Sequence, residues 1–343
     1  MGLQGRRVVV IGYEIPTDLA VERYVVNRDG AQLVDLRSFE PEQVVDQLAA
    51  ADAILTEGST PLRRAVIERL DATVAISVAA VGTDGVDVDA ATDRGIVVTN
   101  VSDYCVHEVA DHTVALLLAA WRRLRAAERV ARGGAWAIDS LRPIQRLRGR
   151  TCGLLGFGRI ARQVAMRMNG FGVDLIAHDP AIVEAPPDEA AFVRLVDREE
   201  LLRRSDLLSL HVPLTSTTAG IIDAAALALL PPGAVVVNCG RGGLVVLEDL
   251  LRTLESGHLA GVALDVFEAE PAPADHPLLA RDDVICTPHM AYYSEQALLQ
   301  LRRQAAQNAV DVMRGGPAAV LNPQALPRRL RGAPGQRDTL AGP

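Results

Sequence analysis

Residues 151–179 limit the fold of this chain more than any other segment. They read TCGLLGFGRIARQVAMRMNGFGVDLIAHD. An apolar run of strand type enters the turn Gly156-Phe157-Gly158, a run of helical period follows, and a second apolar strand ends before Asp179. Strand, glycine turn, helix and strand in close succession form a βαβ unit, whose two strands are parallel. The segment therefore predicts a parallel sheet with a helix packed on it.

The same alternation covers most of the 343 residues. We expect strands at 8–11, 31–36, 53–56, 74–78, 96–98, 151–155, 173–178, 207–211, 234–238, 260–264 and 284–286. We expect helices at 41–50, 61–70, 105–129, 159–169, 198–204 and 294–314. This pattern predicts an α/β fold with two Rossmann-like, doubly wound parallel-sheet domains and a cleft between them. Residues 1–103 and 294–330 are assigned to one domain, 104–293 to the other, and 331–343 to a disordered tail.

The composition excludes several classes of protein. All 35 basic residues are arginine, which we attribute to a GC-rich, bacterial genome. The absence of lysine excludes Schiff-base chemistry and the phosphate-loop lysine. A net charge of −8 lacks the basic footprint of a nucleic-acid-binding protein.

Cysteine spacing and hydropathy indicate the compartment. Four scattered cysteines fit reduced thiols better than a disulfide framework or a metal site. The N-terminus has no apolar signal core, and the longest apolar helical run, 114–121, is too short to span a membrane. We expect a soluble, cytoplasmic protein that holds no metal.

The glycine turn matches the pattern G-x-G-x-x-A at residues 156–161. Gly156 permits the tight turn, Gly158 lets the backbone approach a pyrophosphate, and Ala161 allows the helix to pack closely on the sheet. The first N–H groups of the helix, at Arg159 and Ile160, would face the phosphates. An ordinary tight turn between strand and helix is the alternative interpretation of the pattern on its own.

Asp179 supports a dinucleotide site and selects the cofactor. It lies 23 residues beyond Gly156, where a carboxylate can hold the adenosine ribose hydroxyls. The same charge would repel a 2′-phosphate, and residues 180–183 (PAIV) offer no arginine to bind one. The sequence therefore predicts NAD rather than NADP.

Three further segments lie beyond the glycine turn: Asn-Cys-Gly-Arg-Gly-Gly at 238–243, Asp-Val-Phe-Glu-Ala-Glu-Pro at 265–271, and Thr-Pro-His at 287–289. With the glycine turn they resemble the D-isomer-specific 2-hydroxyacid dehydrogenases, over about residues 50 to 322. The segment after Ile285 is most similar to the branch that holds the C-terminal-binding-protein corepressors and phosphoglycerate dehydrogenase-like proteins. The resemblance implies a catalytic triad of Arg241, Glu270 and His289.

The chemistry of 2-keto acid reduction assigns the same roles. Arg241 would bind the carboxylate and the carbonyl oxygen with its planar fork. His289 would donate a proton to the carbonyl oxygen as hydride arrives. Glu270 would pair with the other ring nitrogen and fix its tautomer, although Glu268 is a competing carboxylate.

The resemblance also implies further contacts. Asp265 would bind the nicotinamide amide, and Val212 and Cys239 would line the cofactor site through their backbones. His107 and His112, on the expected helix 105–129, are interpreted as packing or solvent-facing residues. Tyr292 and Tyr293 would either shape the rim of the pocket or pack at a domain seam.

The substrate loop departs from the family pattern. The backbone N–H groups of Ala79, Ala80, Val81 and Gly82 would hold the substrate carboxylate, but the usual Arg, Gly and Asn of this loop are Val78, Ala80 and Gly85. Glu57 stands where phosphate-recognising members carry Arg, so we expect a small, unphosphorylated 2-hydroxy or 2-keto acid.

We therefore expect an NAD-dependent D-2-hydroxyacid dehydrogenase, with a hinged cleft that closes over its ligands. Helix 105–129 and the arm at 130–149 would form the interface of a homodimer. The alternative is an NAD(H)-sensing, corepressor-like binding protein with weak or no dehydrogenase activity.

Overall fold

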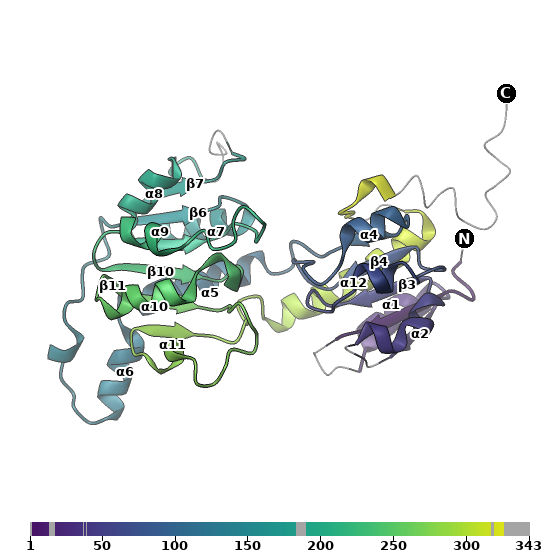
Figure 1. Cartoon of the computed structure of the whole chain (residues 1–343), viewed down its shortest axis with the longest axis horizontal. Coiled ribbons are helices and arrows are strands. Elements are labelled where there is room, and N and C mark those ends of the chain that lie inside the picture. The colour runs from purple at the N-terminus through teal and green to yellow at the C-terminus, as the bar shows by residue number, and fades with distance from the viewer. Residues whose placement is uncertain are drawn as a thin grey trace. The chain divides into compact units, whose positions relative to one another are not determined.

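The computed structural model describes residues 2–13, 18–36, 38, 40–182, 190–316 and 319–325. The chain divides into two compact units: Met1–Tyr104 with Ser294–Pro343, and Cys105–Tyr293 (Figure 1). The tail that we expect to be disordered, 331–343, lies outside the described residues. Within the described ranges no helix is both long and apolar enough to cross a membrane.

The first unit is built on a five-stranded parallel sheet in the order β2-β1-β3-β4-β5. Its strands are β1 (Arg7–Ile11), β2 (Gln32–Asp35), β3 (Ala53–Thr56), β4 (Ala75–Val78) and β5 (Val97–Thr99). Its helices are α1 (Ala20–Arg28), α2 (Val45–Ala49), α3 (Arg64–Ile67), α4 (Val88–Asp93) and α12 (Glu295–Arg314), with 3-10 turns at Pro41–Val44 and Pro323–Ala325.

The side chains of each strand alternate between two apolar cores in this unit. Val8 and Val10 face the core under α1 and α12, whereas Val9 and Ile11 face the core under α2, α3 and α4. Helices therefore cover both faces of the sheet, as expected for parallel strands that are apolar throughout.

The second unit is built on a seven-stranded parallel sheet in the order β12-β11-β10-β9-β6-β7-β8. Its strands are β6 (Thr151–Leu155), β7 (Asp174–His178), β8 (Arg194–Leu195), β9 (Leu207–Leu210), β10 (Ala234–Asn238), β11 (Leu259–Leu264) and β12 (Val284–Cys286). Its helices are α5 (Val106–Trp121), α6 (Leu124–Arg132), α7 (Arg159–Asn169), α8 (Arg198–Arg204), α9 (Ala224–Leu229), α10 (Leu247–Glu255) and α11 (Pro277–Ala280), with 3-10 turns at Asp139–Leu141 and Gly242–Leu244.

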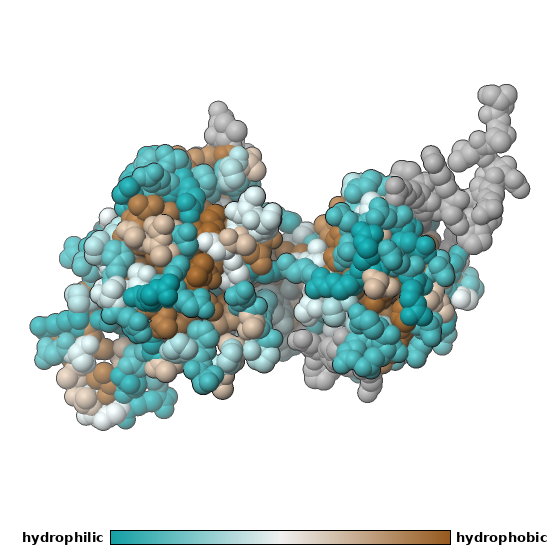
Figure 2. Space-filling view, viewed as in Figure 1, coloured by the Kyte–Doolittle hydropathy of each residue, from teal (hydrophilic) through white to brown (hydrophobic). Residues whose placement is uncertain are grey.

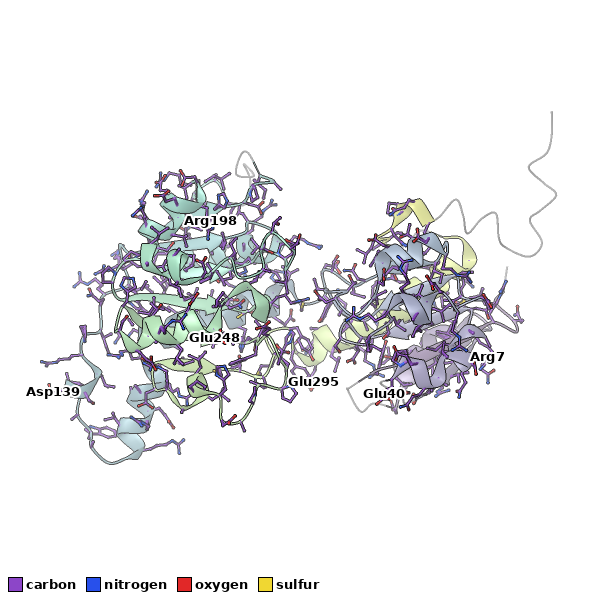
Figure 3. All side chains as sticks on the ribbon, in the orientation of Figure 1. Arg7, Glu40, Asp139, Arg198, Glu248 and Glu295 are labelled. Carbon is purple, nitrogen blue, oxygen red and sulfur yellow. The ribbon has the colours of Figure 1, made fainter. Side chains whose placement is uncertain are left out.

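Two helical layers cover this sheet as well. Apolar side chains of α5 and α7 pack on one face, and those of α8, α9 and α10 pack on the other. Arg198 and Glu248, labelled in Figure 3, mark α8 and α10 on the second face. Two doubly wound parallel sheets confirm the predicted fold class.

The order of the seven strands creates a switch point between β6 and β9. The connection from β6 through α7 leads to β7 on one side, while β9 pairs with β6 on the other. Ligands of open α/β sheets bind at the carboxyl ends of the strands beside such a point. The glycine turn follows β6, so it lies at this position.

The helix expected at 105–129 is wrong as a single element. The chain leaves the helix after Trp121, and α6 begins only at Leu124. Arg123 takes a left-handed backbone with φ of 53°, and its guanidinium donates to the carbonyls of Leu141 and Arg142 at 3.3 and 3.4 Å. Contacts with the arm therefore accompany a break that local helix propensity does not predict.

Candidate active site

The site residues predicted for the second unit all follow the carboxyl end of a strand. Gly156 follows β6, Asp179 follows β7, Val212 follows β9, Arg241 follows β10, Asp265 follows β11 and His289 follows β12. Because the strands are parallel, these ends share one edge of the sheet.

The glycine turn is shaped to receive a phosphate. Gly156 has φ of +91°, and a Cβ there would lie 2.7 Å from the carbonyl carbon of His211 and 2.8 Å from the amide of Val212. A Cβ on Gly158 would meet nothing within 4 Å, so open space lies above this residue. Gly158 is the N-cap of α7 and makes no side-chain cap hydrogen bond, which leaves the positive end of the helix available to an anion.

Asp179 is held against the same turn. One carboxylate oxygen accepts the N–H of Phe157 at 2.9 Å, and the other accepts the N–H of Ala181 at 2.9 Å. The carboxylate therefore stands beside the first glycine, where ribose hydroxyls can also reach it. Open backbone at Gly158, an uncapped helix and this carboxylate together fit NAD.

Two buried groups that follow neighbouring strands, His211 after β9 and Cys239 after β10, stay electrically neutral. Burial lowers the pKa of His211 to about 4, and its Nε2 lies 2.9 Å from the hydroxyl of Ser209. Burial likewise raises the pKa of the Cys239 thiol to about 12. Neither group adds charge to the site near neutral pH, and a protonated thiol suits packing rather than nucleophilic chemistry.

Arg241 lies in a turn that the side chain of Asn238 stabilises. The Asn238 side chain, fully buried, accepts the N–H of Gly240 at 2.9 Å and donates to the carbonyl of Arg241 at 2.8 Å. The Arg241 guanidinium donates to the carbonyl of Gly240 at 2.9 Å. Asn238 was not among the predicted site residues, although Asn at the start of a glycine turn is a signal for this kind of bond.

Gly242 joins this turn to the segment that carries Glu270. A Cβ on Gly242 would lie 1.9 Å from the carbonyl carbon of Phe267 and 2.3 Å from the amide of Glu268. Only a residue without a side chain allows these two backbones to approach so closely. The turn of Arg241 and the turn of Glu270 are therefore in direct backbone contact.

Glu270 and His289 meet at the surface of the unit. Oε2 of Glu270 lies 2.6 Å from Nδ1 of His289, and Oε1 accepts the N–H of Phe267 at 2.9 Å. The side chains are 36% and 45% exposed, so a ligand can reach them. Since Nδ1 is engaged by the carboxylate, Nε2 is the ring nitrogen that can exchange a proton with a ligand.

His289 adopts a backbone conformation that is rare for a residue with a side chain. Its φ is 50°, in the left-handed region. Its N–H donates to the carbonyl of Asp265 at 2.8 Å and to that of Thr287 at 3.0 Å. Strain of this kind persists where surrounding bonds fix the backbone, and it is common in active sites.

Asp265 provides most of those bonds. Its side chain is 1% exposed and accepts the Thr287 hydroxyl at 2.5 Å and the N–H groups of Met290 and Ala291 at 2.9 Å. A carboxylate has about four acceptor positions, so one remains. The contact of Asp265 with the nicotinamide amide stays a prediction.

The ring of His289 also contacts Tyr292. The two ring centroids lie 6.3 Å apart in an edge-to-face arrangement, and Tyr292 makes a similar contact with Tyr293 at 6.4 Å. The tyrosines thus form an aromatic border beside the imidazole.

The loop after β4, in the first unit, narrows the predicted set of carboxylate donors. The N–H of Ala79 donates to the carbonyl of Thr56 at 2.7 Å, so Ala79 cannot offer its N–H to a substrate. Among the described residues no hydrogen-bond partner is found for the N–H groups of Ala80, Val81 and Gly82. Asn100 fixes this loop by donating to the carbonyl of Val81 at 2.6 Å.

The backbone around Gly85 explains why glycine replaces the asparagine of the family pattern at this position. Its N–H donates to the carbonyl of Gly58 at 2.7 Å. A Cβ on Gly85 would lie 2.4 Å from the carbonyl oxygen of Thr60 and 2.6 Å from that of Gly58. The asparagine that the family prefers here would displace the segment that begins at Glu57.

Comparisons with known proteins show the family of this chain. The family described as "D-isomer specific 2-hydroxyacid dehydrogenase, NAD binding domain" matches residues 114–291. D-3-phosphoglycerate dehydrogenase of Methanocaldococcus jannaschii is 37% identical over 292 residues, which cover 85% of this chain and 55% of that protein. The chain thus spans about half the length of the curated relatives it matches.

Solved structures show the same fold. A glyoxylate reductase from Paecilomyes thermophila superposes with a TM-score of 0.84 at 27% identity, over 93% of this chain and 99% of that one. D-lactate dehydrogenase from Aquifex aeolicus, complexed with NAD and lactic acid, gives 0.80 at 26% identity, over 92% and 99%. This chain therefore belongs to the D-isomer specific 2-hydroxyacid dehydrogenase family, and residues 114–291 correspond to its NAD binding domain.

Proposed function

We propose that this protein transfers hydride between NAD(H) and C2 of a small, unphosphorylated 2-keto or D-2-hydroxy acid. The observation that carries the proposal is the 2.6 Å contact between Glu270 and His289, which follow strand ends at the same edge of the sheet as the glycine turn. In the reducing direction, a 2-keto acid, NADH and one proton give a 2-hydroxy acid and NAD⁺. NADH supplies the hydride when it is bound.

The chain's own residues supply the proton and the charge. His289 gives the proton at Nε2 to the carbonyl oxygen, while Glu270 holds Nδ1 and stabilises the orientation of the ring. Arg241 binds the carboxylate with two parallel N–H groups, from a turn fixed by Asn238.

The unphosphorylated substrate is argued from Glu57. Many relatives are named D-3-phosphoglycerate dehydrogenases, so their names imply a phosphorylated acid. In this chain Glu57 follows β3 directly. Burial raises the pKa of Tyr13 well above its usual value, and the charges of Glu22 and Glu57 raise it further. Glu22 is paired with Arg302 at 2.6 and 2.7 Å. The Arg302 guanidinium is therefore already bound to a carboxylate. The negative charge of Glu57 would repel a substrate phosphate placed near it.

A matched substrate pair tests this point. Hydroxypyruvate and 3-phosphohydroxypyruvate differ only in the phosphate, and kcat/KM is measured for each with wild type, Glu57→Gln and Glu57→Arg. We expect wild type to favour hydroxypyruvate and Glu57→Arg to shift the ratio toward the phosphorylated acid by about tenfold or more. A wild-type preference for 3-phosphohydroxypyruvate would reject the unphosphorylated substrate.

We also propose that a second copy of the chain covers α6 and the arm that follows it. Among the described residues of α6 no side chain is buried, and Leu124, Trp136 and Ile138 are 53%, 87% and 65% exposed. Asp139, labelled in Figure 3, marks this arm, and Figure 2 shows the surface coloured by hydropathy. Exposed apolar groups of this size are typical of an interface.

Sedimentation should give a dimer for wild type and a weaker dimer for Trp136→Ser. A stable wild-type monomer would contradict the proposal.

A further inference from the structure

A chain of three side chains connects α5 to the turn of His289. Nε2 of His112 lies 3.0 Å from the hydroxyl oxygen of Thr287 and 3.6 Å from Oδ1 of Asp265. The Thr287 hydroxyl lies 2.5 Å from the same Oδ1. His112 and Thr287 are 175 residues apart in the sequence, and the proposed chemistry uses neither of them.

The hydrogen bonds of this chain have a definite direction. A carboxylate can only accept, so the Thr287 hydroxyl donates to Asp265. The hydroxyl oxygen then accepts from Nε2 of His112, which must carry a proton. Both the neutral tautomer with a proton on Nε2 and the imidazolium meet this requirement.

Asp265 connects these hydrogen bonds to the backbone of the His289 turn. Its Oδ1 also accepts the N–H of Met290, its Oδ2 accepts the N–H of Ala291, and its backbone carbonyl accepts the N–H of His289. These bonds enclose the one residue of the turn with a left-handed backbone. Without Thr287 and His112, Oδ1 would lose a donor in a buried place, and the carboxylate could turn away from the N–H groups that it holds.

We propose that His112 and Thr287 are positioning residues that act through Asp265 to set the orientation of the His289 imidazole. This inference rests on the proposed role of His289 as proton donor. Neither residue touches the reacting atoms in this account. Their main effect should appear in the proton-transfer step, with a smaller change in NADH binding, because Asp265 is also predicted to contact the nicotinamide amide.

The test compares variants that remove a donor with variants that keep it. Thr287→Val and His112→Leu remove donors, whereas Thr287→Ser and His112→Gln keep a hydroxyl and an N–H. His107→Leu is the matched control, because His107 is an exposed histidine on the same helix. For each protein, kcat and KM for a 2-keto acid, the Kd for NADH and the melting temperature are measured.

We expect kcat to fall by about tenfold to a hundredfold in Thr287→Val and His112→Leu, since a displacement of about 1 Å can cost that much. The Kd for NADH should change far less, Thr287→Ser and His112→Gln should recover most of the turnover, and His107→Leu should match wild type. Equal kcat in the valine, leucine and wild-type proteins would overturn the inference. A loss confined to melting temperature or NADH affinity would also overturn it.

A spectroscopic measurement separates this inference from the proposed function. The Cε1–H resonance of His289, assigned with His289→Gln, reports the ring environment without turnover. If wild type reduces no 2-keto acid, the proposed function fails, yet a shifted His289 resonance in His112→Leu and not in His107→Leu would still support the coupling. An unshifted resonance in both His112→Leu and Thr287→Val would reject it.

Discussion

Nδ1 of His289 lies 2.6 Å from Oε2 of Glu270, and the other oxygen of that carboxylate accepts the N–H of Phe267. The pair is therefore anchored to the backbone that follows β11. Glu270→Gln keeps the size of the side chain and removes its charge. We expect kcat to fall by about 10²-fold, the usual scale for impaired acid–base catalysis. NADH affinity should change by much less; equal losses in kcat and NADH affinity would contradict a catalytic role.

Gly242 should tolerate no side chain. Gly242→Ala places a methyl group 1.9 Å from the carbonyl carbon of Phe267, so the turns of Arg241 and Glu270 must separate. We expect a loss of about 1–3 kcal/mol in the free energy of unfolding and a larger loss in kcat/KM. Gly243→Ala is the control, because its methyl group would meet only the end of the Leu214 side chain, at 3.2 Å. Denaturant unfolding and steady-state kinetics compare the two; similar effects would refute the argument.

Asp179 should determine the choice between NADH and NADPH. Asp179→Asn retains an acceptor for the N–H of Phe157 but removes the charge that opposes a 2′-phosphate. We expect the ratio of kcat/KM for NADPH over NADH to rise by about fivefold or more, because unit charges at close range repel by at least about 1 kcal/mol. A ratio that does not change in Asp179→Asn would show that other groups select the cofactor.

Stability should fall in mild acid because of His211. Burial lowers its pKa from 6.5 to about 4, so the unfolded chain binds a proton in a pH range where the folded chain does not. The stabilisation is therefore complete above pH 6.5 and is lost as the pH falls toward 4, by roughly 3 kcal/mol. Urea unfolding at a series of pH values should show a smaller loss for His211→Asn. Parallel pH curves for the two proteins would rule this cause out.

The sequence predicted the regular elements best where local signals were strong. Strands β6, β10 and β12 and helices α7 and α8 have the predicted bounds. Short helices such as α4 and α9 were missed because six residues are too few to show a helical period. Each is capped by an aspartate, Asp87 or Asp223, and that signal could have located it.

Local sequence signals likewise predicted one part of the candidate site, whereas the other part depends on tertiary contacts. Short motifs predicted the glycine turn, Arg241, Glu270 and His289, because each motif carries its chemistry within a few residues. The contact between His112 and Thr287 could not be predicted, since it joins a helix to a strand end far away in the sequence. The availability of N–H groups at Ala79–Gly82 also depends on tertiary bonds: only the structure shows that Ala79 donates to Thr56.

Oxidation of NADH by 2-keto acids tests the central claim most directly. The rate is followed by NADH absorbance for wild type, His289→Ala and Arg241→Ala with a panel of unphosphorylated 2-keto acids, and NADH affinity is measured for each protein. We predict that wild type turns over at least one acid and that both variants lose about 10²-fold or more in kcat/KM while NADH still binds. Tight NADH binding by wild type without turnover of any acid would contradict the account and favour a cofactor-sensing protein.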